Sequence, residues 1–444
     1  MIVYRKALLG LHLLFRLYGS AILRTAVWGV IAAIQTTLLY FLPDNYLNQY
    51  FANGRIMIYT LFVSLMSLLV IFRQNASYGR WHEGRTKLQL MTSAWLDSCV
   101  KCLSFDGGDK VFGQPDAASM RFKLDCVHLF SLMHGVALQF LRSDWMLANL
   151  AEHDESKLPP WDAANSPTFS PAVMDYFVLR SVSHRRLAYN AAHPIPVVGL
   201  LTEQEVYHLC GNKPERVRSL SNKDWDNAKQ RPSIFRMAQH HMFANSQGKY
   251  VRGAAERLYT LYFLVHERFR QRLTEGGLDM PAPILTNMYT SLQKGMDGFE
   301  QCRYLCDTPF PFAWAQLIMV MLLFLQFTAP FAVVSAVSDK ALGIIFAAFS
   351  VQAYWALNEV SRELEDPFCF PPNDIPLARL QYQFNERILA AACTELPGRS
   401  ADPQYRLSVQ EALHSAAMGS LGAPDGAITA DEPARRAQHD DCPV

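Results

Sequence analysis

The longest apolar stretches of this sequence lack the side chains on which most membrane-embedded chemistry depends. Four such stretches cover residues 23–43, 56–72, 312–338 and 341–357, and none contains His, Asp, Glu or Lys. Proton-coupled transporters use intramembrane carboxylates or histidines, haem-binding bundles use paired histidines, and intramembrane hydrolases need a nucleophile with its base. The sequence therefore argues against these classes and predicts no enzyme. The hydroxyl, amide and apolar groups that remain suit passive permeation through a pore with a hydrophobic constriction.

Charged residues are also scarce for a chain of this size. They make up 18% of 444 residues, against 50% hydrophobic residues, and the formal net charge is +1. This balance gives no reason to expect a nucleic-acid partner. The nine cysteines include Cys99-x-x-Cys102 but no second close pair with a histidine at zinc spacing. We therefore expect reduced thiols on helices in a cytosol-like compartment.

Acidic residues are missing from the beginning of the chain. The first is Asp44, and four basic residues precede it: Arg5, Lys6, Arg16 and Arg24. A transit peptide is disfavoured because Ser is scarce and no small-residue cleavage site follows a short apolar core. Residues 1–22 are instead predicted to form a basic amphipathic segment that lies on the membrane.

Hydrophobic runs within residues 23–91 and 309–358 predict two pairs of transmembrane helices. Within the first pair, residues 56–80 are the candidate pore-lining helix, because neither Pro nor Gly interrupts its apolar part and its second part turns basic and aromatic. The positive-inside rule then puts both termini and residues 92–308 on the cytosolic side. The plasma membrane is the default location, and an organelle membrane such as that of a plastid stays open.

Residues 92–308 carry charges at the density of a soluble protein. We predict a large helical cytosolic region there, with irregular loops at 152–171 and 211–233. The apolar stretch 124–141 is expected to be a buried soluble helix, because it contains an aspartate and two histidines. Residues 395–444 are rich in Ala, Gly, Pro and Asp without periodicity and are predicted to be a disordered tail.

An acidic segment followed by a helix is predicted for residues 359–394. Its acidic cluster consists of Glu363, Glu365 and Asp366. Carboxylates at the end of a helix oppose its macrodipole, so the cluster should have a partner. That partner is either a cation or an arginine such as Arg362 or Arg379.

Several segments carry a family resemblance. Residues 72–85, FRQNASYGRWHEGR, resemble the segment after the second span of bestrophins, in the form of the bacterial and plastid branch. Residues 308–314, TPFPFAW, resemble that family's entry to its third span, and residues 363–377 resemble the acidic segment after its fourth. The resemblance covers about residues 4–105 and 285–390. It implies an all-α membrane protein with four transmembrane helices per subunit, assembled as a homopentamer around a central pore that the second span lines.

The resemblance also implies a pore neck built from three residues four positions apart. Carried over, these residues are Ser64, Leu68 and Phe72. Ser64 stands where the family usually has Ile or Val, so the outer ring should be wider or wetter. The alternative is that all three simply pack between spans.

Basic and aromatic residues follow the neck directly. Arg73 and Arg80 at the inner mouth would raise the local concentration of anions, and Arg80 and Trp81 can anchor the helix at the membrane interface. Aromatic ring edges, such as that of Phe72, carry partial positive charge.

Animal bestrophins hold Ca²⁺ in an acidic clasp. The matching side chains would be Glu363, Asp366 and Asp374, but Pro371 and Pro372 replace two acidic positions. Because proline offers only its carbonyl, we expect weak or absent calcium gating.

The sequence as a whole therefore predicts a channel in the lipid bilayer for small monovalent anions such as chloride, bicarbonate or nitrate. Two alternatives stay open: the same architecture conducting small cations, or a non-conducting membrane scaffold.

Overall fold

The computed structural model describes residues 19–41, 55–107, 117–154, 189–210, 254–278, 280–368 and 374–393. The loop predicted at 211–233 and the tail predicted at 395–444 lie outside these residues, as do most of the N-terminal segment 1–22 and most of the loop 152–171. Apart from two short strands, the regular secondary structure of the described part is helical, which confirms the all-α class predicted from the sequence.

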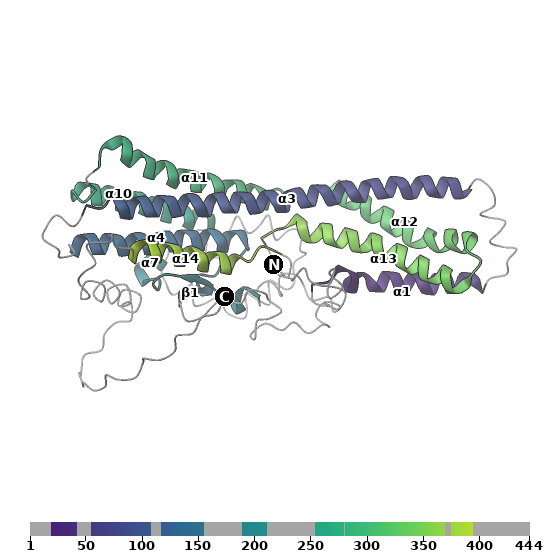
Figure 1. The fold of residues 1–444 in the computed structure, drawn as a ribbon. Helices are drawn as coiled ribbons and strands as arrows, with labels where there is room; N and C mark the ends of the chain where they lie inside the picture. Colours follow the sequence, from purple (N-terminus) through teal and green to yellow (C-terminus); the bar gives the residue numbers. More distant parts are fainter. Residues whose placement is uncertain are drawn as a thin grey trace, which may run out of the picture.

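Helix α3 (Arg55–Phe105) runs along the entire described fold (Figure 1). Its 51 residues correspond to about 76 Å, more than twice the thickness of the hydrocarbon core of a bilayer. The predicted pore helix 56–80 is the first part of this longer helix. Helices α1 (Ala21–Tyr40), α12 (Phe312–Ala336) and α13 (Lys340–Glu365) flank its first half.

Five described helices are long and apolar enough to cross a membrane. Four of them, α1, α3, α12 and α13, have only 17–33% of their apolar window buried inside the subunit. The fifth, α4 (Ala117–Leu141), has 78% of its window buried. Its surface is covered by protein on most sides, so α4 serves as the core of the second half rather than as a lipid-exposed span.

Close packing joins the helices of the membrane half. The Trp28 and Trp355 rings stack 4.0 Å apart between α1 and α13. A Cβ atom at Gly29 would lie only 2.9 Å from Gln352 Oε1, so glycine permits this approach of the two helices. Helix α12 begins at Phe312 directly after Pro311, which suits a helix start because a backbone N–H there would have no partner within the helix.

The second half of the fold surrounds residues 88–103 of α3. Helices α10 (Ala254–Thr274), α11 (Ala282–Asp307) and α14 (Leu377–Cys393) pack with α3 and α4 around one hydrophobic core. Two three-residue strands, β1 (Leu150–Glu152) and β2 (Ile195–Val197), pair in parallel beside α14, after the 3₁₀ turn Leu147–Asn149. Helix α7 (Glu203–Cys210) follows β2.

A buried polar network fixes α14 against α4 and α3. His134 Nδ1 lies 2.6 Å from Gln381 Oε1, and its Nε2 lies 3.0 Å from the Thr92 hydroxyl. Gln381 uses its amide group to donate to Ser131 O and Asn385 Oδ1, so its Oε1 accepts the proton of His134 Nδ1. Complete burial lowers the pKa of His134 to about 4, although the bond to Gln381 opposes this. His134 is therefore neutral and structural at physiological pH.

A second histidine connects α4 to α7. Both ring nitrogens of His128 face acceptors, Val198 O at 2.7 Å and Glu205 Oε1 at 2.8 Å, and only the protonated ring can donate to both. Glu205 also accepts from the Thr202 backbone N–H, while the Thr202 hydroxyl accepts from the Glu205 N–H, which makes a capping box at the start of α7. Gly199 has a φ of +80°, and a Cβ there would lie 3.0 Å from His128 Nδ1. The protonated ring of His128 therefore stabilises the turn from Val198 to Glu205 that leads into α7.

This connection predicts a pH dependence. Burial alone lowers the pKa of His128, but the bond and charge of Glu205, the Val198 carbonyl and the charge of Asp125 raise it above its ordinary 6.5. Burial raises the pKa of Glu205, but His128 and Thr202 lower it below its ordinary 4.5. The pair therefore stabilises the fold fully between pH 4.5 and 6.5, and this contribution, about 1 kcal/mol, is lost as the pH rises through the raised pKa of His128.

Hydrogen–deuterium exchange of residues 198–210 will check this prediction. After correction for intrinsic rates, protection should fall between about pH 5.5 and about pH 8.5 in the wild type and stay level in His128→Gln. Amides of the central part of α4 serve as the internal control. Equal pH profiles in the two proteins would contradict the prediction.

Candidate functional site along helix α3

The three candidate neck residues lie on the exposed side of α3. In the single subunit Leu68 is 64% exposed, Phe72 is 57% exposed and Ser64 is also exposed. Met66 and Val70, on the opposite side, are buried in the core of the membrane half. Packing inside the subunit therefore does not explain the residue types at these three positions. Their side chains are available to line a pore or to pack against a neighbouring subunit.

Two of the neck side chains have local contacts that modify the prediction. The Ser64 hydroxyl donates to Thr60 O at 2.8 Å, so its proton is already used within the helix. The Phe72 ring stacks on Trp314 of α12, with ring centroids 5.3 Å apart and planes inclined by 22°. Trp314 therefore limits how the Phe72 ring can turn, and the sequence analysis did not identify this contact.

Arg73 does not present a free positive charge at the inner mouth. It is 4% exposed, and its guanidinium binds Glu365 Oε1 through Nε at 2.8 Å and Nη2 at 2.7 Å and Asn358 Oδ1 at 2.6 Å. Each residue along a helix turns by about 100°, so the residue after Phe72 points toward α13. The predicted attraction of anions by Arg73 therefore needs correction, because Glu365 neutralises its charge.

Arg80 and Trp81 lie where the two halves of the fold meet. The Arg80 guanidinium donates to Glu365 O at 3.1 Å and to Leu305 O at 2.8 Å, and so connects α3 with the ends of α13 and α11. Trp81 is half-buried against the hydrophobic core of the second half and lies beside Tyr78. Both residues thus help to join the two halves of the fold, in addition to any role at the lipid interface.

The segment after α13 is held against α3 by further close contacts. The Ser361 hydroxyl donates to Gln74 Oε1 at 2.7 Å. A Cβ at Gly84 would lie 3.0 Å from both Pro367 and Phe368, so glycine allows this segment to lie directly on α3. We call these contacts, together with those of Arg73 and Arg80, the α3–α13 junction.

The acidic cluster after the fourth span binds arginines. Glu363 pairs with Arg24 of α1, which also binds Glu359 at 3.1 Å, while Glu365 pairs with Arg73. The predicted partner Arg362 binds Glu359 at 2.8 Å. An arginine partner is thus present, but sequence reasoning missed Arg24 and Arg73 because they lie about 300 positions away in the chain.

The carboxylates proposed for a calcium clasp are not assembled into a site. Glu363 is engaged by Arg24, Asp366 is the exposed C-cap of α13, and Asp374 lies beyond residues 369–373, which are not described. In the described ranges no group of three His, Cys, Asp or Glu side chains is arranged to hold a metal ion.

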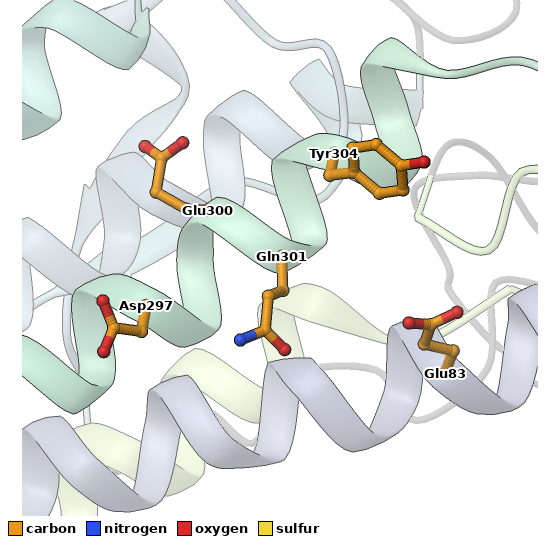
Figure 2. A pocket seen from close by; sticks show the side chains of 5 residues that line it. All are labelled: Glu83, Asp297, Glu300, Gln301 and Tyr304. Atoms are coloured by element: carbon orange, nitrogen blue, oxygen red, sulfur yellow. The ribbon is translucent and has the colours of Figure 1, made fainter.

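A groove between α3 and α11 was not anticipated from the sequence. Figure 2 shows Glu83 on α3 and Asp297, Glu300, Gln301 and Tyr304 on α11 around it, and its volume is about 360 Å³. Glu300 accepts a hydrogen bond from the Tyr259 hydroxyl at 2.5 Å and lies 3.4 Å from Arg303. Within the described part of the chain, Glu83 and Asp297 make no hydrogen bond or ion pair. The groove is therefore acidic, and two of its carboxylates are uncompensated.

Comparison with known proteins identifies a matching family and a related protein. Residues 1–118 and 229–390 match the family described as bacterial/fungal bestrophin protein. A voltage-dependent anion channel-forming protein of Ralstonia nicotianae is 27% identical over 123 residues, which are 28% of this chain. The match spans only about two fifths of that relative, 39% of its length.

Solved structures share the fold. Two mutant forms of a bacterial bestrophin homologue from Klebsiella pneumoniae superpose with TM-scores of 0.52 and 0.51 at 15% identity. Each alignment covers 84% of this chain and 99% or 100% of the Klebsiella chain. The helical architecture described above is therefore that of these homologues.

Proposed function

Because this chain belongs to the bacterial and fungal bestrophin family, we propose that it is an ion channel that passes small monovalent anions such as chloride, bicarbonate or nitrate. The observation that carries this proposal is the exposed stripe of α3, where Leu68 and Phe72 stay uncovered in the single subunit. Apolar side chains at this depth of a membrane protein need either lipid, a neighbouring subunit or a narrow pore beside them. The name of the Ralstonia relative supports an anion as the permeating species.

In the proposed assembly five subunits surround a central pore lined by α3. Ser64, Leu68 and Phe72 form three successive rings, and the ring edges of Phe72 favour anions while the apolar surface forces partial dehydration. The plasma membrane is the proposed location, with both termini and residues 92–308 on its cytosolic side.

One observation favours cations as a second candidate. The charge of Arg73 is neutralised by Glu365, and the groove beside α3 contains the uncompensated carboxylates of Glu83 and Asp297. A path with acidic residues and without a free arginine would concentrate cations rather than anions. Both candidates share the same pore, so only the sign of the permeating ion separates them.

Planar-bilayer recording of the purified protein in a KCl gradient, then in KHCO₃, tests the proposal. We expect currents that reverse near the equilibrium potential of the anion in both salts. Reversal near the equilibrium potential of potassium would instead support the second candidate, a channel for cations. Silence from protein whose insertion into the bilayer is verified would contradict both and favour the scaffold.

A further inference from the structure

The exposed positions of α3 continue past the neck to the end of the helix. They recur with steps of three and four residues, so they form one stripe along a single side. Beyond Phe72 the stripe contains Asn75, Tyr78, Gly79, His82, Glu83, Thr86, Gln89, Leu90, Ser93, Asp97, Val100 and Ser104. Because α3 is unbroken over this length, a pore lined by its first half continues along the same stripe in its second half.

The formal charges on this stripe are all negative. Between residues 57 and 104 of α3, Glu83 and Asp97 are the exposed residues with a formal charge, whereas the arginines and lysines of the same segment are buried or half-buried. Arg73 is paired with Glu365, and Arg80 donates to two backbone carbonyls. The side of α3 that continues from the neck is therefore acidic, although the segment as a whole is rich in basic residues.

Asp97 and Glu83 differ in whether a nearby positive group pairs with the carboxylate. Asp97 lies 2.5 Å from Lys101 Nζ and accepts a hydrogen bond from the Ser291 hydroxyl at 2.6 Å. Glu83 has no such partner in the part of the chain that the structure describes, and it faces the groove that also contains Asp297 and Glu300 (Figure 2). Glu83 thus presents to a passing ion a carboxylate that forms no hydrogen bond or ion pair with the described residues.

We propose that Glu83 is a specificity-determining residue that attracts cations to the ion path beyond the neck and thereby limits the preference for anions. This inference rests on the proposed channel function. Glu83 lies eleven positions after Phe72, which is close to three helical turns, so the two lie on the same side of α3 about 16 Å apart. At this distance Glu83 acts on an ion that has already left the neck, and it acts through the electric field of its carboxylate rather than through direct contact.

Reversal potentials of the wild type and Glu83→Gln in a KCl gradient test this proposal. The variant should shift toward the anion equilibrium potential, with the chloride-to-potassium permeability ratio rising roughly threefold, and Glu83→Lys should shift further. The difference should shrink when ionic strength rises from about 0.05 M to about 1 M, because salt screens exposed charges. A change in packing alone would not produce this salt dependence.

Two control variants separate the position of the charge from its mere removal. Asp97→Asn, on the same stripe but compensated by Lys101, should shift the ratio less than Glu83→Gln. Glu267→Gln, at a half-buried carboxylate of α10 that is paired with Arg270 and does not lie on α3, should leave it unchanged. Since Glu83 makes no hydrogen bond or ion pair with any residue that the structure describes, Glu83→Gln should elute as the same oligomer as the wild type. If Glu83→Gln elutes differently, Asp297→Asn tests the charge of the same groove instead.

The outcomes are distinguishable. Normal currents with the same reversal potential in Glu83→Gln and Glu83→Lys would overturn the inference and leave the channel function intact. A wild type that carries no current would overturn the channel function and the inference together. A shift equally large in Glu267→Gln would overturn the inference by assigning the effect to the total charge of the protein instead of to Glu83.

Discussion

Replacement of Arg73 with Met is expected to destabilise the folded subunit by about 3–5 kcal/mol, because removal of one partner leaves the other charge of a buried pair uncompensated. Arg73 is 4% exposed, and the side chain of Glu365 is only 15% exposed. The substitution also removes the donor to Asn358 Oδ1 and the contact of the guanidinium with the Phe310 ring at 5.2 Å. The α3–α13 junction loses its central contact as a result.

Thermal unfolding of the detergent-solubilised protein measures this effect. Arg85→Met is the matched control, since Arg85 is half-buried and its side chain makes one hydrogen bond to the described residues, a long one of 3.4 Å to Gln89. In the double variant Arg73→Met/Glu365→Met the loss should be smaller than in Arg73→Met, because no unpaired carboxylate remains. Equal melting temperatures of Arg73→Met and Arg85→Met would show that the pair contributes little.

Replacement of Phe72 with Ala is expected to increase unitary conductance by about tenfold, which corresponds to a barrier lower by about 1.4 kcal/mol. The Phe72 ring is 57% exposed in the subunit, so its loss widens the proposed neck without opening a cavity in the core. Loss of the ring edge should also weaken the preference for anions. Leu68→Ala should act in the same direction with a smaller effect, since leucine has no ring edge.

Single-channel recording in symmetric salt measures this change. Phe327→Ala is the control, because Phe327 of α12 is an equally apolar aromatic residue with 60% exposure that does not lie on α3. Its conductance should equal that of the wild type. If Phe72→Ala and Leu68→Ala both conduct like the wild type, the stripe does not line the pore and the neck proposal is wrong.

The fold class and the family were predictable because they depend on local signals. Long apolar runs predict helices, and the motif at 72–85 predicts the family without knowledge of any contact. The start of α12 at Phe312 follows from Pro309 and Pro311, since proline does not fit the interior of a preceding helix. These features need only the residues next to one another in the chain.

The environment of the candidate site depended on contacts between distant segments, and sequence reasoning did not find them. Arg73 was interpreted from its place beside Phe72, but its partner Glu365 is 292 positions away and turns it into half of a neutral pair. Glu363 was considered as a metal ligand, yet Arg24 lies against it across two helices. Glu83 was part of the family motif, and its uncompensated charge became visible only once α11 was placed beside α3.

The continuity of α3 has a mechanical consequence. A helix of 51 residues with no break acts as a lever, and a tilt of about 5° around its midpoint moves each end by about 3 Å. In the proposed pore, movement of α11 or α14 against the far end of α3 would therefore change the diameter at Phe72, which lies about 12 Å from the midpoint and is displaced by about 1 Å at this tilt. If α3 lines the pore as proposed, a stimulus received tens of ångströms from the membrane needs no relay of rearranged side chains, because the same helix extends from the site of the stimulus to the neck.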